Sequence, residues 1–118
     1  MQELNARKSV SLSNIKNTML QAQARPVHLY MEANPNPNSL KFVANFMLVD
    51  EGVSFDFPDA ESAKISPLAQ ELFNFAAVER VFVASNFVTV TKSESVEWSE
   101  IQGIVRDHIK KYLEAGKA

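Results

Sequence analysis

The stretch Asn34-Pro35-Asn36-Pro37-Asn38-Ser39-Leu40-Lys41-Phe42 interrupts an apolar run and then returns at once to strand-like alternation. Each proline fixes its own φ, removes a backbone donor and disfavours helix in the asparagine before it. The asparagine side chains can hydrogen-bond to nearby backbone or tolerate left-handed geometry. The sequence therefore predicts a rigid, extended, polar connection between two strands, whereas a generic hairpin needs only Asn-Gly.

Alternating apolar and polar residues predict strands on both sides of this connection. Within the first and third predicted strands, Val27, Leu29 and Met31, and then Val53, Phe55 and Phe57, are expected to point inward. Val88 and Val90 should also face in, while Thr89 and Thr91 face out. The predicted strands are 27–32, 39–43, 53–57, 78–83 and 87–91, with the apolar run 46–49 as a further strand or a continuation, and Ala84-Ser85-Asn86 joining the last two into a hairpin.

Two helices are predicted after the third strand and at the end of the chain. Ser66-Pro67 combines a capping hydroxyl with proline at the first helical position. In the last helix, Ser95 is the predicted N-cap and Gly116 the stop signal, and apolar residues from Trp98 to Tyr112 recur at steps of three and four. We expect an α+β domain: a mostly antiparallel sheet of four to five strands with two main helices on one face.

Residues 1–26 are expected to form a short N-terminal arm, helical or extended, preceding a domain at 27–115. The arm has a loose apolar stripe at helical spacing and is basic and poor in acids, which is also the composition of a transit peptide. We favour the arm because its arginine content is low for a targeting segment.

Composition limits the possible chemistry. The 118 residues are 46% hydrophobic and 22% charged, as in an ordinary globular domain, and include no cysteine. Disulfides and thiolate ligands are therefore excluded, and we expect no cofactor. No apolar run approaches a bilayer-spanning length of about 18 residues. The net charge of −2 leaves the part beyond the basic arm acidic, which disfavours nucleic acid as a partner. We expect a cytoplasmic protein that binds neither nucleic acid nor membrane.

Few residues could support catalysis or metal binding. No nucleophile elbow, phosphate loop or dinucleotide fingerprint occurs, so we do not expect an enzyme, although a small enzyme of unknown chemistry stays open. An alternative is an iron or divalent-metal site. Its candidate ligands are His28, Asp50, Glu51, Asp56, Asp59 and His108. They follow no EF-hand spacing, and we favour a solvated acidic surface with two separate histidines over a metal site.

Phe82 and Phe87 flank the predicted hairpin turn. If exposed they would form an apolar interaction patch, and if covered they would only extend the core.

Four separated motifs occur in an order that resembles a known family. They are Asn34 to Phe42, Ser66-Pro67-Leu68-Ala69 with Leu72-Phe73, Val78 to Val83 with Asn86 to Lys92, and Trp98 opening the last helix. Over about residues 27–113 the chain resembles the N-terminal domain of Nfu/NifU-like iron–sulfur cluster scaffold proteins. In full-length members this domain precedes one carrying a Cys-x-x-Cys motif, which shares a cluster between two chains.

The resemblance implies a non-catalytic adaptor in iron–sulfur cluster assembly, here stand-alone and without the cysteines that hold a cluster. Its partners would be assembly proteins or client apoproteins, and the chain would be a monomer or a weak dimer. The candidate partner-binding residues are Asn34, Pro35, Asn36, Pro37, Asn38, Lys41, Phe82 and Phe87. The asparagines can equally be structural, fixing the crossing between the first two strands.

Overall fold

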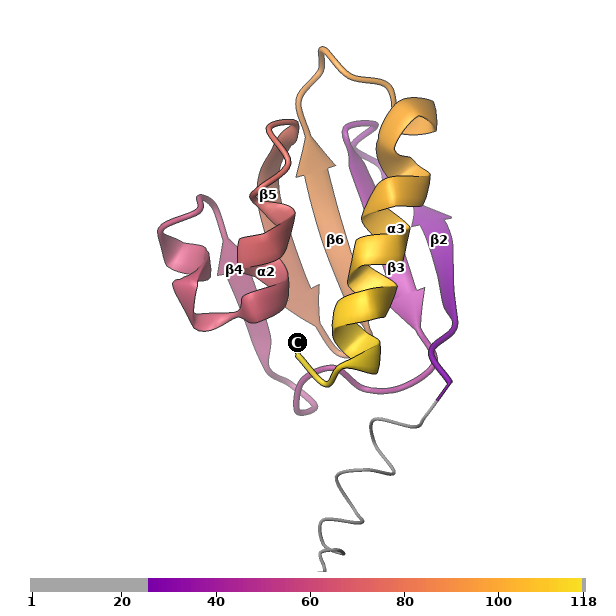
Figure 1. Ribbon diagram of the computed structural model, residues 1–118, viewed down its shortest axis with the longest axis vertical. Helices are drawn as coiled ribbons and strands as arrows, with labels where there is room; N and C mark the ends of the chain where they lie inside the picture. The colour runs from indigo at the N-terminus through magenta and orange to yellow at the C-terminus, as the bar shows by residue number, and fades with distance from the viewer. Residues whose placement is uncertain (1–25, 118) are drawn as a thin grey trace, which may run out of the picture.

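The computed structural model describes residues 26–117, which form a sheet with helices on one face (Figure 1). The strands are β2 (Leu29–Ala33), β3 (Ser39–Ala44), β4 (Ser54–Phe57), β5 (Val78–Ala84) and β6 (Phe87–Lys92). They lie in the order β2-β3-β6-β5-β4, and all neighbours are antiparallel. The expected α+β fold with a mostly antiparallel sheet is confirmed. The N-terminal arm expected at residues 1–26 lies outside the described residues, except for Pro26.

Three helical segments lie in front of the sheet in Figure 1. They are the 3₁₀ turn η1 (Ser62–Ile65), α2 (Pro67–Leu72) and the long α3 (Trp98–Glu114). The core lies between these helices and the sheet, because the inward residues of the strands and one stripe of each helix are apolar. Its fully buried members include Phe42, Val81, Val88, Val90, Leu68, Leu72, Val105 and Ile109.

The helix boundaries follow local capping chemistry. Ser66 Oγ accepts a hydrogen bond from Ala69 N at 3.1 Å, as the Ser-Pro signal predicted. The prediction that Ser95 caps α3 is wrong, because the helix begins at Trp98. Glu97 N instead donates to Glu100 Oε1 at 3.1 Å, which is half of a capping box. Ser95 is already engaged with the hydroxyl of Ser93, 2.8 Å from its own.

The apolar run 46–49 is a loop, so the strand predicted there is wrong. Leu48 N and Val49 N both donate to one carbonyl, that of Ser85, at 2.7 and 3.4 Å. A ladder would instead alternate its bonds along a partner strand. Apolar character in this run therefore reflects side chains that lie against a corner of the sheet, and alternation alone could not distinguish the two cases.

The edge strand β4 is less buried than its alternation suggested. Phe57 is buried, but Val53 and Phe55 each remain 38% exposed. The stacked rings of Phe55 and Phe57 point to the helix side of the sheet, where η1 and the 46–49 loop leave Phe55 incompletely covered.

Candidate docking surface

The Asn-Pro connection between β2 and β3 is held by its own side chains. Asn34 Oδ1 accepts from Asn36 N at 3.1 Å, and Asn36 Oδ1 accepts from Asn38 N at 2.9 Å. Ser39 N then donates to the carbonyl of Asn36 at 2.9 Å. These successive Asx turns replace the ladder bonds that the two prolines cannot make. The connection is thus shaped locally, and Pro35, Asn36 and Pro37 stay exposed.

Asn38 has a second task that reasoning from the sequence missed. Its Oδ1 accepts a hydrogen bond at 3.1 Å from the Nζ of Lys92, a side chain only 5% exposed. The same ammonium donates to Ser93 O at 3.2 Å and lies 5.8 Å from the ring centroid of Trp98. Within residues 26–117 no carboxylate forms an ion pair with it. The strand alternation does predict this burial, because Lys92 follows Val88 and Val90 at every second position and so lies on the same inward face of β6.

The sheet face opposite the helices brings three predicted site residues together. Lys41 Nζ lies 4.1 Å from the ring centroid of Phe87, and the rings of Phe82 and Phe87 are 6.2 Å apart. Thr89 is paired with Lys41 on one side and with Phe82 on the other, so all four side chains share this face. Within the described residues no helix covers it, and the two rings are half-buried. We call Lys41, Phe82, Phe87 and Thr89 the open face.

Charged pairs border the open face on both sides. Lys41 Nζ lies 3.5 Å from Glu32 Oε1 on β2. Toward β4, Arg80 donates to the two carboxylate oxygens of Asp56 at 2.9 and 2.6 Å. These hydrogen bonds lower the pKa of Asp56 and raise that of Arg80. Tyr30, paired with Val43 next to Phe87, is 57% exposed.

The Asn-Pro connection borders the same face. Ser39 directly follows it, and the Ser39 hydroxyl lies 2.7 Å from that of Thr91 beside the open face. Aromatic rings inside a polar and charged rim are typical of protein–protein interfaces. The geometry therefore suits the docking of a protein.

The candidate metal ligands do not converge. Among residues 26–117 no three His, Asp or Glu side chains lie close enough to hold an ion. His28 directly precedes β2, and its backbone N donates to Asn45 Oδ1 at 3.0 Å. Asp56 is paired with Arg80, and Asp59 accepts from Ser62 N at 2.8 Å. Asp50 and Glu51 are exposed on their loop.

His108 belongs to a separate group between α2 and α3. Its Nδ1 lies 3.1 Å from Glu71 Oε2 without hydrogen-bond alignment, and its ring stands edge-on to Phe75 at 4.9 Å. Tyr112 donates to Glu71 Oε1 at 3.3 Å. Burial, and then the charge of Glu71, raise the pKa of Tyr112. These contacts join α2 to α3.

Comparison with known proteins gives the family context. Residues 29–116 match the family model described as scaffold protein Nfu/NifU N terminal. The chain is 38% identical over 92 residues to the mitochondrial NFU1 iron-sulfur cluster scaffold homolog of Drosophila persimilis, covering 78% of this chain and 33% of that protein. For the Drosophila willistoni homolog the identity is 35% over 107 residues, covering 91% and 37%. The chain thus spans about a third of the length of these relatives.

A solved structure shows the same fold. The solution structure of a NifU-like protein from Saccharomyces cerevisiae has a TM-score of 0.70 at 24% identity and covers 98% of this chain and 92% of that chain.

The comparisons also correct one expectation. The fly relatives are named as mitochondrial, which contradicts the expected cytoplasmic location. The expectation was based partly on the absence of cysteine, which fits any reducing compartment. The absence of cysteine therefore does not distinguish the cytoplasm from another reducing compartment. No helix among the described residues is long and apolar enough to cross a bilayer.

The family match covers nearly all of the described residues, and both relatives are more than 30% identical over most of the chain. The chain therefore belongs to the Nfu/NifU scaffold family and corresponds to its N-terminal domain.

Proposed function

We propose that this domain is a non-catalytic adaptor that docks onto iron–sulfur assembly proteins or client apoproteins through its open face. The observation that carries the proposal is the grouping of Lys41, Phe82 and Phe87 on a sheet face that no described helix covers. The relatives are named as iron–sulfur cluster scaffolds, which supplies the process in which docking would occur.

The absence of cysteine from the 118 residues supports a role in binding proteins instead of the cluster itself. Clusters are held chiefly by thiolates, with histidine as the less common ligand. Here the two histidines lie in separate environments. The domain would contribute recognition, while thiolates supplied by other domains or other chains hold the iron.

Recognition would depend on a few side chains. The two phenylalanine rings offer rigid apolar area, and Lys41, held over one of them, offers a charge to an acidic group of the partner. Asn34, Pro35, Asn36, Pro37 and Asn38 would form the neighbouring rim. Because Lys41 lies over the ring of Phe87, it also reduces the ring area exposed to water in the unbound protein.

The test is affinity purification of the tagged protein from cross-linked cells of its native host, followed by quantitative mass spectrometry. The variant Phe82→Thr/Phe87→Thr keeps β-forming side chains and removes both rings. We expect it to recover assembly factors or cluster proteins at least about fivefold less than wild type. The matched control is Ile104→Thr, since Ile104 is 50% exposed on α3, away from the open face.

Two outcomes would contradict the proposal. One is recovery of no assembly factor or cluster protein by the wild type. The other is equal recovery by the wild type and by a double variant whose melting temperature shows that it is folded.

A further inference from the structure

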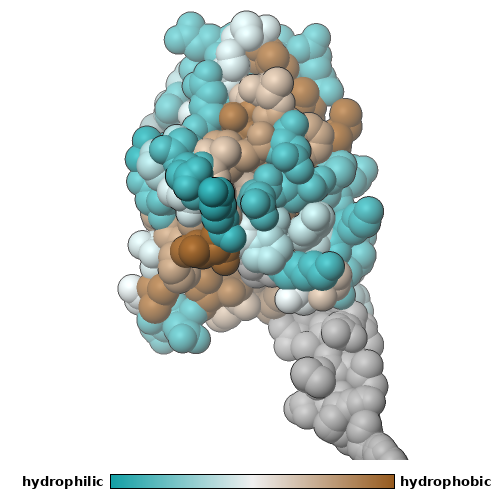
Figure 2. All heavy atoms as spheres, turned by 60° about the vertical axis from the view of Figure 1, so that its left-hand side comes forward, coloured by the Kyte–Doolittle hydropathy of each residue, from teal (hydrophilic) through white to brown (hydrophobic). Residues whose placement is uncertain are grey.

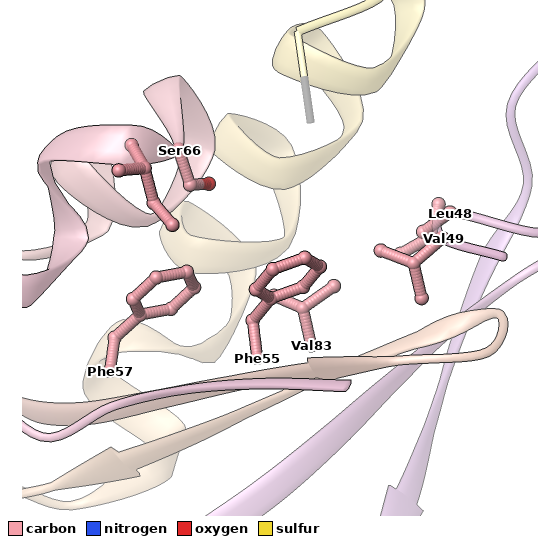
Figure 3. A pocket seen from close by; sticks show the side chains of 7 residues that line it. Leu48, Val49, Phe55, Phe57, Ser66 and Val83 are labelled. Atoms are coloured by element: carbon pink, nitrogen blue, oxygen red, sulfur yellow. The ribbon is translucent and has the colours of Figure 1, made fainter. Parts of the chain in front are cut away.

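A groove lies on the helix side of the molecule, at the corner away from the open face. It runs between β4, η1 and the loop 46–53, and its volume is about 150 Å³, below the roughly 300–1,000 Å³ of small-molecule sites. Figure 3 shows the rings of Phe55 and Phe57 rising from the sheet below Ser66, with Leu48 and Val49 facing them from the loop. Nearly all of its lining is apolar.

Exposed apolar side chains extend the groove into a larger patch. Ile65, which lines the groove, is 73% exposed, Met47 is 50% exposed, and Val53 and Phe55 are each 38% exposed. A second hollow continues from Leu48 toward Leu113 at the end of α3. In Figure 2, hydrophobic side chains gather on this side of the molecule with hydrophilic ones around them. The exposed apolar patch is wider than the groove itself, and such a patch is better suited to binding a segment of a protein than to enclosing a small molecule.

Exposed acidic residues flank the groove's lining residues along the chain, and we call them its rim. Asp50 and Glu51 follow Val49 on the loop, and among the described residues neither forms an ion pair. On the other side, Asp59 and Glu61 precede Ile65, and only Glu61 has a basic neighbour, Lys64, at 3.1 Å. The negative rim would repel an anionic membrane surface and attract a basic segment. One lysine, Lys117, lies at the far end of the second hollow.

We propose that this groove binds a basic amphipathic segment of a partner protein, with apolar side chains seated between Phe55 and Ile65 and lysines or arginines against the rim. The site is distinct from the open face, because Phe55 and Phe57 point to the helix side of β4 while Asp56 is paired with Arg80 on the other side. It can therefore be tested without reference to the iron–sulfur role.

The probe is a synthetic 18-residue peptide with leucines at helical spacing on one face and lysines elsewhere. Its matched control has glutamate in place of every lysine. Titrated into the ¹⁵N-labelled full chain, the lysine peptide should shift the amide signals of Leu48, Val49, Phe55 and Ile65, and its affinity should fall as salt is raised. The glutamate peptide should leave these signals unchanged.

Two variants test the two halves of the site, and both change exposed residues so that folding is preserved. Ile65→Ser should weaken binding about fivefold or more, whereas Ile104→Ser, the same change at an exposed site on α3, should not. Asp50→Lys/Glu51→Lys should weaken binding about fivefold at low salt. Its control, Glu94→Lys/Asp107→Lys, changes the net charge equally at two exposed positions away from both hollows and should retain most of the affinity.

Several outcomes would overturn the proposal. These are equal binding of the two peptides, equal loss in a variant and its control, or shifts confined to Lys41, Phe82 and Phe87 on the open face. The chain has no cysteine, so Ser11→Cys offers a single site for a spin label. Broadening of the Leu48 and Phe55 signals without peptide would show that residues 1–25 of the same chain occupy the groove, which would also overturn it.

Discussion

The three asparagines of the Asn-Pro connection should differ sharply when each is replaced by alanine. Asn38→Ala removes the acceptor 3.1 Å from the ammonium of Lys92, which is only 5% exposed and keeps Ser93 O as its remaining acceptor. A hydrogen bond to a charged group contributes about 1.5–3 kcal/mol, so we expect about 2 kcal/mol of destabilisation. Asn34→Ala and Asn36→Ala each remove an exposed bond that water can replace, and should cost about 0.5 kcal/mol.

Thermal and urea unfolding of the three variants measure these values. For a domain of this size, about 2 kcal/mol corresponds to a fall in melting temperature of roughly 10 °C. Lys92→Met provides the internal check, because it removes the ammonium and keeps a side chain of similar length. In that background Asn38→Ala should cost at least about 1 kcal/mol less than in the wild type.

Equal losses for the three alanine variants would refute this account of the connection. So would a cost of Asn38→Ala that is the same with and without Lys92, since Asn38 would then act through its backbone conformation and not through the ammonium. If Asn34→Ala or Asn36→Ala instead reduced partner recovery at unchanged stability, these residues would contact the partner.

Three further changes test other parts of the fold. Ser66→Ala should lower the free energy of unfolding by about 1 kcal/mol in urea titrations, because Ala69 N loses its cap. The hydrogen bonds from Arg80 lower the pKa of Asp56 below its ordinary value of 3.8, so the pair stabilises the fold at pH values above 3.8. This stabilisation is lost as the pH falls through the lower pKa of the folded state. The melting temperatures of wild type and Arg80→Gln should therefore differ at neutral pH and converge in acid. Trp98→Ala should lower the free energy of unfolding by about 2 kcal/mol, which is less than the loss expected for a fully buried tryptophan. The Trp98 ring is only partly buried, and its centroid lies 6.3 Å from that of Phe42. An unchanged melting temperature would place Trp98 outside the core.

The strands could be predicted because alternation fixes which side chains share a face, and the register keeps Thr89 beside Lys41 and Phe82. Alternation does not say what covers a face, so the exposure of Phe82 and Phe87 had to come from the structure. The run 46–49 failed for a related reason: apolar composition reports contact with the sheet, whereas a strand also needs a free partner edge. The burial of Lys92 was not predicted, because a lysine at an inward position departs from the apolar alternation that identifies buried strand residues.

Strand β4 decides whether the two proposed surfaces can act independently. Its odd positions, Phe55 and Phe57, point to the helix side and line the groove, while Asp56 pairs with Arg80 on the side of the open face. A partner on one surface therefore does not occupy the other, and the two could be filled at once. Ile65 lines the groove and Phe82 lies on the opposite side of the sheet, so the effects of their substitution on binding should add. Loss of both activities from one exposed substitution would mean that the surfaces are coupled through β4, and the two sites would then have to be treated as one.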